Sequence, residues 1–164
     1  MPDILQLEDF YVTRLSATWH APEPPSEGQV QFESKYTIDY DVLRRKDDAR
    51  LFALRFRFRL ESHKEGKAAG YDIDSEIMGL FRFPESMTED EMQRLVRVNG
   101  SVILYGVLRG EVAAFTGSFP GSKCILPAVY MPEIVERIEN QKKVAVATRP
   151  AKAAAKGKRK TKSS

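Results

Sequence analysis

Few side chains of this 164-residue chain have the types and spacing that catalysis requires. Cys124 is the single cysteine, and with only His20 and His63 the sequence offers no zinc-ligand spacing and no intramolecular disulfide. A thiol nucleophile needs a base beside it, whereas Cys124 lies in the apolar run KCILPAV, which is typical of a packed thiol. The sequence also lacks a phosphate-binding glycine loop, HExxH and GxSxG. We therefore expect no enzymatic activity, no bound metal and no cofactor.

A row of arginines is the second feature with chemical potential. Residues 51–60 read LFALRFRFRL, in which Phe or Leu occupies every even position, while Arg55, Arg57 and Arg59 occupy odd positions. A period of two is typical of a half-buried β-strand, because successive side chains leave opposite faces. The apolar row therefore faces a core. The arginines face water, acidic neighbours or a polyanion such as a nucleic acid.

Three further strands must position these arginines. Alternating patterns predict a first strand over 5–19, bent near Asp9, a second over 30–42 and a fourth over 71–83. The proline-rich stretch 20–29 indicates a long crossover loop. Short turns before and after the arginine strand predict antiparallel hairpins.

The first hairpin brings acids next to the arginines. If it closes with Leu43 near Leu51, Asp39 lies opposite Arg55 and Asp41 is a diagonal neighbour of Arg55. A register shifted by two residues would keep the same kind of pairing, because the side-chain period is two.

The second hairpin adds acids on the other side. Its expected register places Asp74 opposite Arg59 and Glu76 opposite Arg57. The arginines would then form the middle rung of an acid, base, acid ladder. We therefore expect them to face carboxylates of their own sheet, with the nucleic-acid role as the alternative.

Two helical stretches follow the strands. Thr88 and Glu91 form a capping box that begins a short helix over 88–96, and Asn99 is expected to cap a second, long helix that runs to Phe115. The long helix carries small residues four apart, a spacing that lets another surface approach closely. That surface is either the protein's own sheet or a second subunit. The small residues are Gly106, Gly110 and Ala114.

A last helix is predicted from about Pro132, after an irregular stretch rich in Pro and Gly. Its apolar side chains fall on one side of the helix. They are Tyr130, Met131, Ile134, Val135 and Ile138.

The composition indicates one domain and a tail. Residues 1–141 contain 17 Lys and Arg against 23 Asp and Glu, whereas residues 142–164 contain 9 Lys and Arg and no acid. We expect 1–141 to form an α+β domain, a four-stranded antiparallel sheet covered by the long helix and the C-terminal helix. The Lys/Ala-rich basic tail, 142–164, is expected to be disordered. Without a secretory signal or a membrane-spanning run, we expect a soluble, cytoplasmic protein.

This order of elements, over about residues 4–140, resembles the SecB and SecB-like export chaperones. The first strand with Leu5-Gln6-Leu7 and its terminal Ala21-Pro22 is similar to the first strand of that family. Ser118-Phe119-Pro120, followed by Leu126-Pro127-Ala128-Val129, resembles the sequence before the last helix of the family.

The resemblance implies an ATP-independent holdase, a homotetramer built as a dimer of dimers, which binds unfolded polypeptides or preproteins in apolar grooves and passes preproteins to SecA. It implies groove positions at Trp19, Phe32, Tyr36, Tyr130, Met131, Ile134 and Ile138. These side chains are also compatible with an ordinary core. Glu76 fits a contact position for the translocase.

Departures from the family pattern place the handover to SecA in question. Where the family has acidic residues at the end of the first strand, this chain has Arg14 and His20, and its C-terminal extension is basic. Some SecB-like chaperones instead protect an antitoxin, and this chain fits that group as well.

The basic tail supports a hypothesis from another class. Its nine cations would let the chain act as a nucleic-acid- or ribosome-associated factor, or contact anionic surfaces, with binding that weakens steeply with salt. No aromatic residue lies among the lysines, so base stacking is not expected. A tail that serves solubility alone is the simpler alternative.

Overall fold

The computed structural model describes residues 4–21, 35–64, 67–68 and 70–147. Four strands form one antiparallel sheet in the order β1-β6-β3-β2. The strands are β1 (Gln6–His20), β2 (Lys35–Arg44), β3 (Leu51–Glu61) and β6 (Gly70–Arg82). Two short strands, β4 (His63–Lys64) and β5 (Lys67–Ala68), follow β3 and precede β6 along the chain, and they pair with each other in a separate two-stranded sheet. The predicted four-stranded sheet is confirmed.

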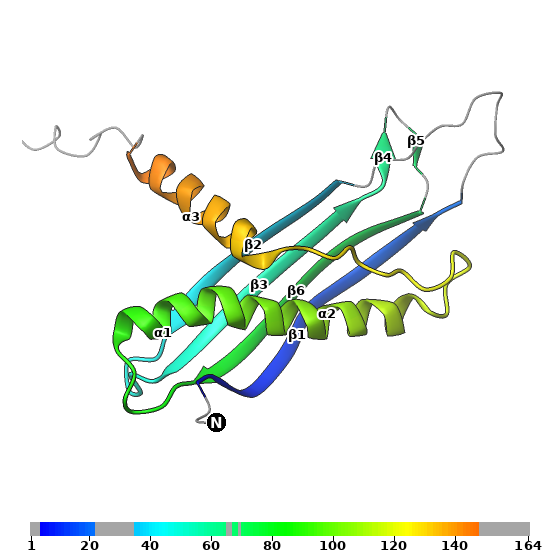
Figure 1. Cartoon of the computed structure of the whole chain (residues 1–164). Coiled ribbons are helices and arrows are strands. Elements are labelled where there is room, and N and C mark those ends of the chain that lie inside the picture. Colours follow the sequence, from blue (N-terminus) through cyan, green and yellow to red (C-terminus); the bar gives the residue numbers. More distant parts are fainter. Residues whose placement is uncertain (1–3, 22–34, 65–66, 69, 148–164) are drawn as a thin grey trace, which may run out of the picture.

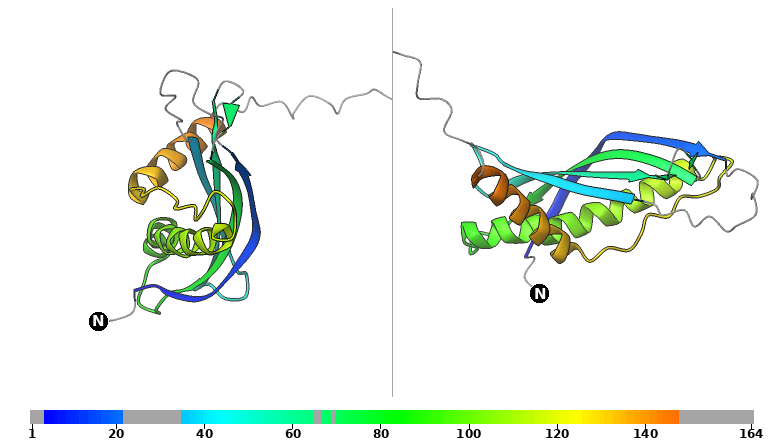
Figure 2. Two further views of the ribbon diagram at one scale, coloured as in Figure 1. Left: turned by 90° about the vertical axis from the view of Figure 1, so that its right-hand side faces the viewer. Right: turned by 90° about the horizontal axis from the view of Figure 1, so that it is seen from above.

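The helices all lie on one face of this sheet, which curves around them (Figures 1 and 2). They are α1 (Glu89–Leu95), a π-helical turn η1 (Val96–Gly100), α2 (Ser101–Thr116) and α3 (Met131–Ala147). Figure 1 shows α2 running across the front of the strands and α3 crossing near β2. The α+β fold class is therefore as predicted.

The core follows the period of two in β3. Phe52, Leu54, Phe56 and Phe58 are at most 1% exposed, and they face the helices. The helix α2 approaches the sheet closely at Gly79, where a Cβ would lie 2.7 Å from Leu104 Cδ2. Burying this continuous apolar layer is the main source of stability of the fold.

The first helix begins as predicted, because Thr88 and Glu91 form a capping box. The predicted cap at Asn99 is wrong: the chain stays helical from α1 through η1 into α2. Core residues in this region recur every four positions, as at Val96, Gly100 and Leu104. A straight α-helix would rotate such a row away from the sheet, and the wider π-helical turn corrects the phase.

Two strand predictions differ in detail from the structure. The expected bend of β1 is confirmed by a register shift between Leu7 and Asp9, and a second shift follows between Val12 and Arg14. In the first hairpin, Leu43 pairs with Ala53 rather than lying near Leu51, so the prediction of Asp39 opposite Arg55 is wrong: Asp39 lies opposite Arg57, and Asp41 lies opposite Arg55. The reason is that the Leu51 amide donates to the Asp48 carbonyl within the turn.

The C-terminal helix is longer than predicted. It extends to Ala147, so residues 142–147 are helical and do not belong to the tail that we expected from 142 onward. Lys142 anchors this part of the helix, because its Nζ donates to the Tyr40 carbonyl oxygen at 2.6 Å. The remaining tail, 148–164, and the crossover, 22–34, lie outside the described residues.

Candidate functional site

The predicted groove residues of α3 divide between core and surface. Met131, Ile134 and Ile138 are 3%, 6% and 6% exposed and belong to the core. Tyr130, immediately before the helix, is 71% exposed. In this single chain only Tyr130 is directly available to a partner, and a groove role for the other three stays a prediction.

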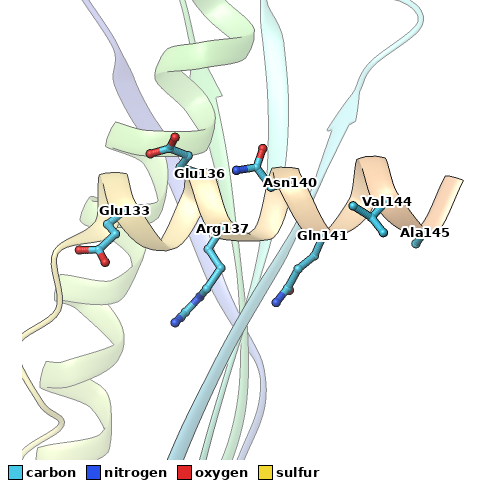
Figure 3. A pocket seen from close by; sticks show the side chains of 7 residues that line it. All are labelled: Glu133, Glu136, Arg137, Asn140, Gln141, Val144 and Ala145. Atoms are coloured by element: carbon cyan, nitrogen blue, oxygen red, sulfur yellow. The ribbon is translucent and has the colours of Figure 1, made fainter. Parts of the chain in front are cut away.

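The outward side of α3 carries mainly charged and amide residues, but the surface that these residues expose to a hollow beside them is mostly apolar, because their aliphatic stems form it. This open hollow of about 610 Å³ lies along the outward side, and Figure 3 shows the side chains that line it. Val144 is 65% exposed, but charged and amide side chains surround it. The helix is thus amphipathic in the ordinary sense, with its apolar side in the core. The lining residues are Glu133, Glu136, Arg137, Asn140, Gln141, Val144 and Ala145.

Trp19 belongs to an aromatic cluster at one end of the sheet. It is half-buried and pairs across β1 and β6 with Tyr71, so both side chains point to the same face. The ring of Tyr71 contacts Phe119 at 6.0 Å between centroids, and Phe119 contacts Phe115 at 5.6 Å. Phe115 is 43% exposed. We call Trp19, Tyr71, Phe115 and Phe119 the aromatic cluster.

The segment 117–130 between α2 and α3 fastens this cluster to the sheet. The hydroxyl of Tyr71 donates to the Ser122 carbonyl at 2.5 Å, and the Cys124 amide donates to Thr116 Oγ1 at 2.8 Å. Ser122 has a φ of 65°, a left-handed conformation that is uncommon outside glycine. Figure 1 shows the segment returning from the end of β1 across the face of the sheet to the start of α3.

Tyr36 lies on the opposite edge of the sheet from Trp19. It is 38% exposed and stacks on Phe58 with 6.1 Å between ring centroids. The structure therefore places Trp19 beside Tyr71, whose ring contacts Phe119, and on the opposite edge of the sheet from Tyr36. Phe32, the remaining predicted groove residue, lies outside the described residues.

Sequence reasoning missed Phe115, Phe119 and Ile125 as candidate contact residues. Ile125 is 63% exposed, whereas its neighbours Cys124 and Leu126 are buried at 8% and 1%. The alternation in the run KCIL was a usable signal, because an extended chain turns successive side chains in opposite directions. Phe115 gave no comparable signal, since it ends an almost wholly apolar helix.

The other face of the sheet carries the charged ladder. Asp39 and Asp41 accept from Arg57 at 2.5 and 2.8 Å, and Asp74 lies 3.4 Å from Arg59. For these two arginines the predicted pairing with the sheet's own carboxylates is confirmed. Arg55 is the exception, because no ion pair joins it to any described residue.

The electrostatics of the ladder follow from these contacts. Burial raises the pKa of Asp39, but hydrogen bonds from Arg57 and from the Tyr40 amide outweigh it, so the pKa is lowered overall. Glu76, the predicted translocase contact, accepts from Thr13 Oγ1 at 2.8 Å. It pairs in register with Arg14 and Arg57. Its role toward a partner stays a prediction.

The described residues offer little for catalysis. Cys124 is buried, and that burial raises the pKa of its thiol, which disfavours the reactive thiolate. Within the described ranges no three His, Cys, Asp or Glu side chains are grouped so as to hold a metal ion. Among the described helices none is long and apolar enough to cross a bilayer.

Comparison with known proteins shows the fold. No protein-family model and no curated protein matches the chain. Among solved structures it is similar to the SecB-like chaperone Rv1957 of Mycobacterium tuberculosis, solved with a ChAD peptide from the antitoxin HigA1 (Rv1956). The TM-score is 0.54 at 21% identity, over 77% of this chain and 91% of that one.

A protein of unknown function from Streptococcus agalactiae matches with a TM-score of 0.41 and 11% identity, over 76% of this chain and 97% of that chain. The likeness to Rv1957 agrees with the strand order and the single helical layer described above. The chain has a SecB-like fold.

Proposed function

We propose that this chain is an ATP-independent chaperone that binds non-native polypeptides and holds them in a soluble state. The observation that carries the proposal is the exposure of aromatic side chains on the helix-bearing side of a SecB-like fold, namely Tyr130, Tyr36 and Phe115. Aromatic side chains present large, rigid apolar surfaces that accept many sequences. The peptide-bound state of the similar chaperone gives the proposal further support.

A dilution experiment tests this function. A chemically unfolded model protein is diluted into buffer without ATP, and light scattering is followed with and without the chain. We expect the full chain and a version that ends at Ala147, the last residue of α3, to suppress aggregation equally. The double variant Trp19→Ala, Tyr130→Ala should remain folded and lose most of this suppression. Full suppression by the double variant would refute the assigned residues, and none by the full chain would refute the function.

The class of client is the next step of the proposal. Glu76 already accepts a hydrogen bond from Thr13, and the middle of β1 presents Arg14, which is paired with Asp74 at 2.9 Å. Both acids of this surface, Glu76 and Asp74, are therefore already engaged by residues of β1. We favour a client held for its own protection, such as an antitoxin segment, over a preprotein for export. If purified SecA binds the chain and the variant Glu76→Gln loses that binding, a preprotein for export becomes the favoured client.

Self-association is part of the same proposal. The small residues of α2 do not pack on the sheet of their own chain: a Cβ at Gly106 or Gly110 would meet no atom within 4 Å. Val102, near the start of α2, adds an apolar side chain that is 50% exposed. The stripe is therefore free to receive a second subunit. We propose the homotetramer of the SecB family, in the cytoplasm, as the working assembly.

The basic tail supports a second function that is tested separately. The seven Lys and Arg residues of 148–164, a stretch without any Asp or Glu, would bind nucleic acid or ribosomes by charge alone. A gel shift with RNA should then disappear between about 50 and 200 mM salt, and also in the version that ends at Ala147. A shift that survives the truncation would refute the tail as its cause.

A further inference from the structure

Arg55 is the member of the arginine row that the sheet does not neutralise. Its cross-strand neighbours are Asp41 on β2 and Met78 on β6. Asp41 is engaged elsewhere, because its Oδ2 accepts from Arg57 at 2.8 Å. The Nε of Arg55 is buried and has no hydrogen-bond acceptor in the described part of the chain. A buried donor without an acceptor is costly, so a ligand that supplies an acceptor there would be bound favourably.

The side chain of Arg55 lines a hollow of about 370 Å³ at the β2 edge of the sheet. Two more cations line the same hollow: Arg97 from η1 and Lys142 from α3. Positively charged side chains from three separate elements, β3, η1 and α3, therefore line one cavity. We call it the Arg55 hollow.

The acids of the Arg55 hollow are already occupied. Glu139 accepts from the Tyr40 hydroxyl at 2.6 Å and lies 3.6 Å from Arg97. The Nζ of Lys142 donates to the Tyr40 carbonyl oxygen at 2.6 Å and lies 4.5 Å from the centre of the Tyr40 ring. Its distance to Asp39 Oδ1, 3.8 Å, is longer than that hydrogen bond. Three cations and two carboxylates, Asp41 and Glu139, line the hollow, and Asp41 also pairs with Arg57, so the described lining has an excess of positive charge.

The surroundings of the hollow indicate what kind of anion it takes. It lies along β2, an edge strand whose outer side pairs with no other described strand, so an extended peptide can lie there. Leu43, which also lines the hollow, is 46% exposed and offers an apolar contact beside the cations. An anion attached to an apolar peptide satisfies both features. Guanidinium groups bind carboxylates in a planar, two-point geometry.

We propose that the Arg55 hollow binds a carboxylate of the held polypeptide, so that the chain prefers apolar segments that carry Asp or Glu. The inference rests on the proposed chaperone function. It adds a rule of selectivity: aromatic contacts accept many sequences, and the hollow favours those with an acidic side chain.

The test uses two labelled peptides with the same Leu, Tyr and Ser residues, one with glutamates and the other with glutamines at the same positions. Their binding to the full chain is measured by fluorescence anisotropy. We expect the glutamate peptide to bind about tenfold more tightly, as charge-assisted hydrogen bonds from arginine imply. In Arg55→Met this preference should fall to about one, with the affinity for the glutamine peptide unchanged.

The matched control is Arg59→Met, which removes the same charge from the same face of the same strand but does not line the hollow. It should keep the preference; equal loss in both variants would indicate a general charge effect and overturn the inference. Inorganic phosphate at constant ionic strength should displace the glutamate peptide selectively. Phosphate binding without a glutamate preference would show a site for free anions instead.

The outcomes separate the two proposals. If neither peptide binds the full chain, the chaperone function itself fails. If both bind equally well, the function stands and the Arg55 hollow has no role in selecting clients. A preference that persists in Arg55→Met would also overturn the inference. Circular dichroism of each variant establishes that it is folded.

Discussion

The indole nitrogen of Trp19 lies directly against Gly121, so closely that a Cβ on Gly121 would stand only 1.7 Å from it. This contact joins the end of β1 to the segment that connects α2 with α3. Glycine is required here by space: Gly121 shows no positive φ, whereas its neighbour Ser122 does. The half-buried state of Trp19 therefore depends on a glycine that is far away in the sequence.

Replacing this glycine should displace the indole or the segment. We expect Gly121→Ala to lower the free energy of unfolding by about 1–3 kcal/mol, the usual cost of overpacking. Because Trp19 is the only tryptophan, its fluorescence emission should shift to the red as the ring gains exposure. The rescue control is Trp19→Leu, in which Gly121→Ala should cost much less. An unchanged emission spectrum and melting temperature would contradict the contact.

The fold was largely predictable because β-strands carry a local signal. The alternation in β3 reports which side chains face the core, and the short turns indicate antiparallel neighbours, so sheet and helical layer follow from the sequence. The register of the first hairpin did not follow, since Leu51 belongs to the turn through its bond to Asp48. The cap at Asn99 failed because the π-helical turn depends on packing against β3 and β6.

The candidate site was less predictable than the fold. An apolar stripe on a helix has the same sequence signature whether it faces a core or a groove, and in α3 it faces the core. The contact of Trp19 with Gly121 joins residues about a hundred positions apart, for which a single sequence has no signal. Arg55 has no ion-pair partner among the described residues because Asp41 accepts its hydrogen bond from Arg57 instead. Which of the two arginines binds Asp41 depends on side-chain geometry, for which the sequence has no signal.

The arginine ladder predicts opposite effects for two neighbouring arginines. Arg57→Met should lower the free energy of unfolding at neutral pH by about 0.5–1 kcal/mol, because Asp39 and Asp41 lose a partly exposed ion pair. Arg55→Met should leave the stability unchanged or raise it, because it removes a buried donor without an acceptor. Denaturant unfolding of both variants checks this. Equal destabilisation would contradict the difference between the two sites.

The same ladder predicts that the stability of the fold decreases at acid pH. The folded-state pKa of Asp39 lies below its unfolded value, so its contribution is present above about pH 4 and is lost as the pH falls through the folded pKa. The difference in stability between the wild type and Arg57→Met should therefore narrow from pH 7 to pH 3. Thermal unfolding across that range measures it, and a constant gap would exclude Asp39 as the titrating partner.

The environment of Tyr40 predicts that the stability of the fold decreases at alkaline pH. Burial, and then the hydrogen bond to Glu139, raise the pKa of Tyr40 above its ordinary value. The protonated hydroxyl thus stabilises the fold below about pH 10, and this contribution is lost as the pH rises further. Tyr40→Phe should cost about 1–3 kcal/mol at neutral pH, as expected for a hydrogen bond to a charged group, and should show a smaller alkaline loss.

The control for this prediction is Tyr105, whose hydroxyl donates to the Pro127 carbonyl at 2.6 Å. Burial raises the pKa of Tyr105 to about 12, so it contributes its own alkaline loss. Tyr105→Phe should leave intact the part that depends on Glu139. If Tyr40→Phe has the same alkaline profile as the wild type, the contact between Tyr40 and Glu139 does not hold α3 in solution.

The exposed small residues of α2 predict the assembly state. In an isolated chain Gly110→Ala should raise stability by about 0.5–1 kcal/mol, because alanine is the better helix former and has free space around it. In the proposed oligomer Gly110→Leu should separate subunits and lower the mass measured by light scattering. An oligomer whose mass is unchanged in Gly106→Leu and Gly110→Leu would place its interface elsewhere.

Tyr130 and Ile134 separate binding from packing within one short stretch of chain. Tyr130 is 71% exposed, so Tyr130→Ala should change the free energy of unfolding by no more than about 0.5 kcal/mol while it weakens the binding of apolar peptides. Ile134 is 6% exposed, so Ile134→Ala should cost about 2–5 kcal/mol. If Ile134→Val, a milder change in the same core position, weakens peptide binding as much as Tyr130→Ala does, the clients must open the core beneath α3 and the groove must include it.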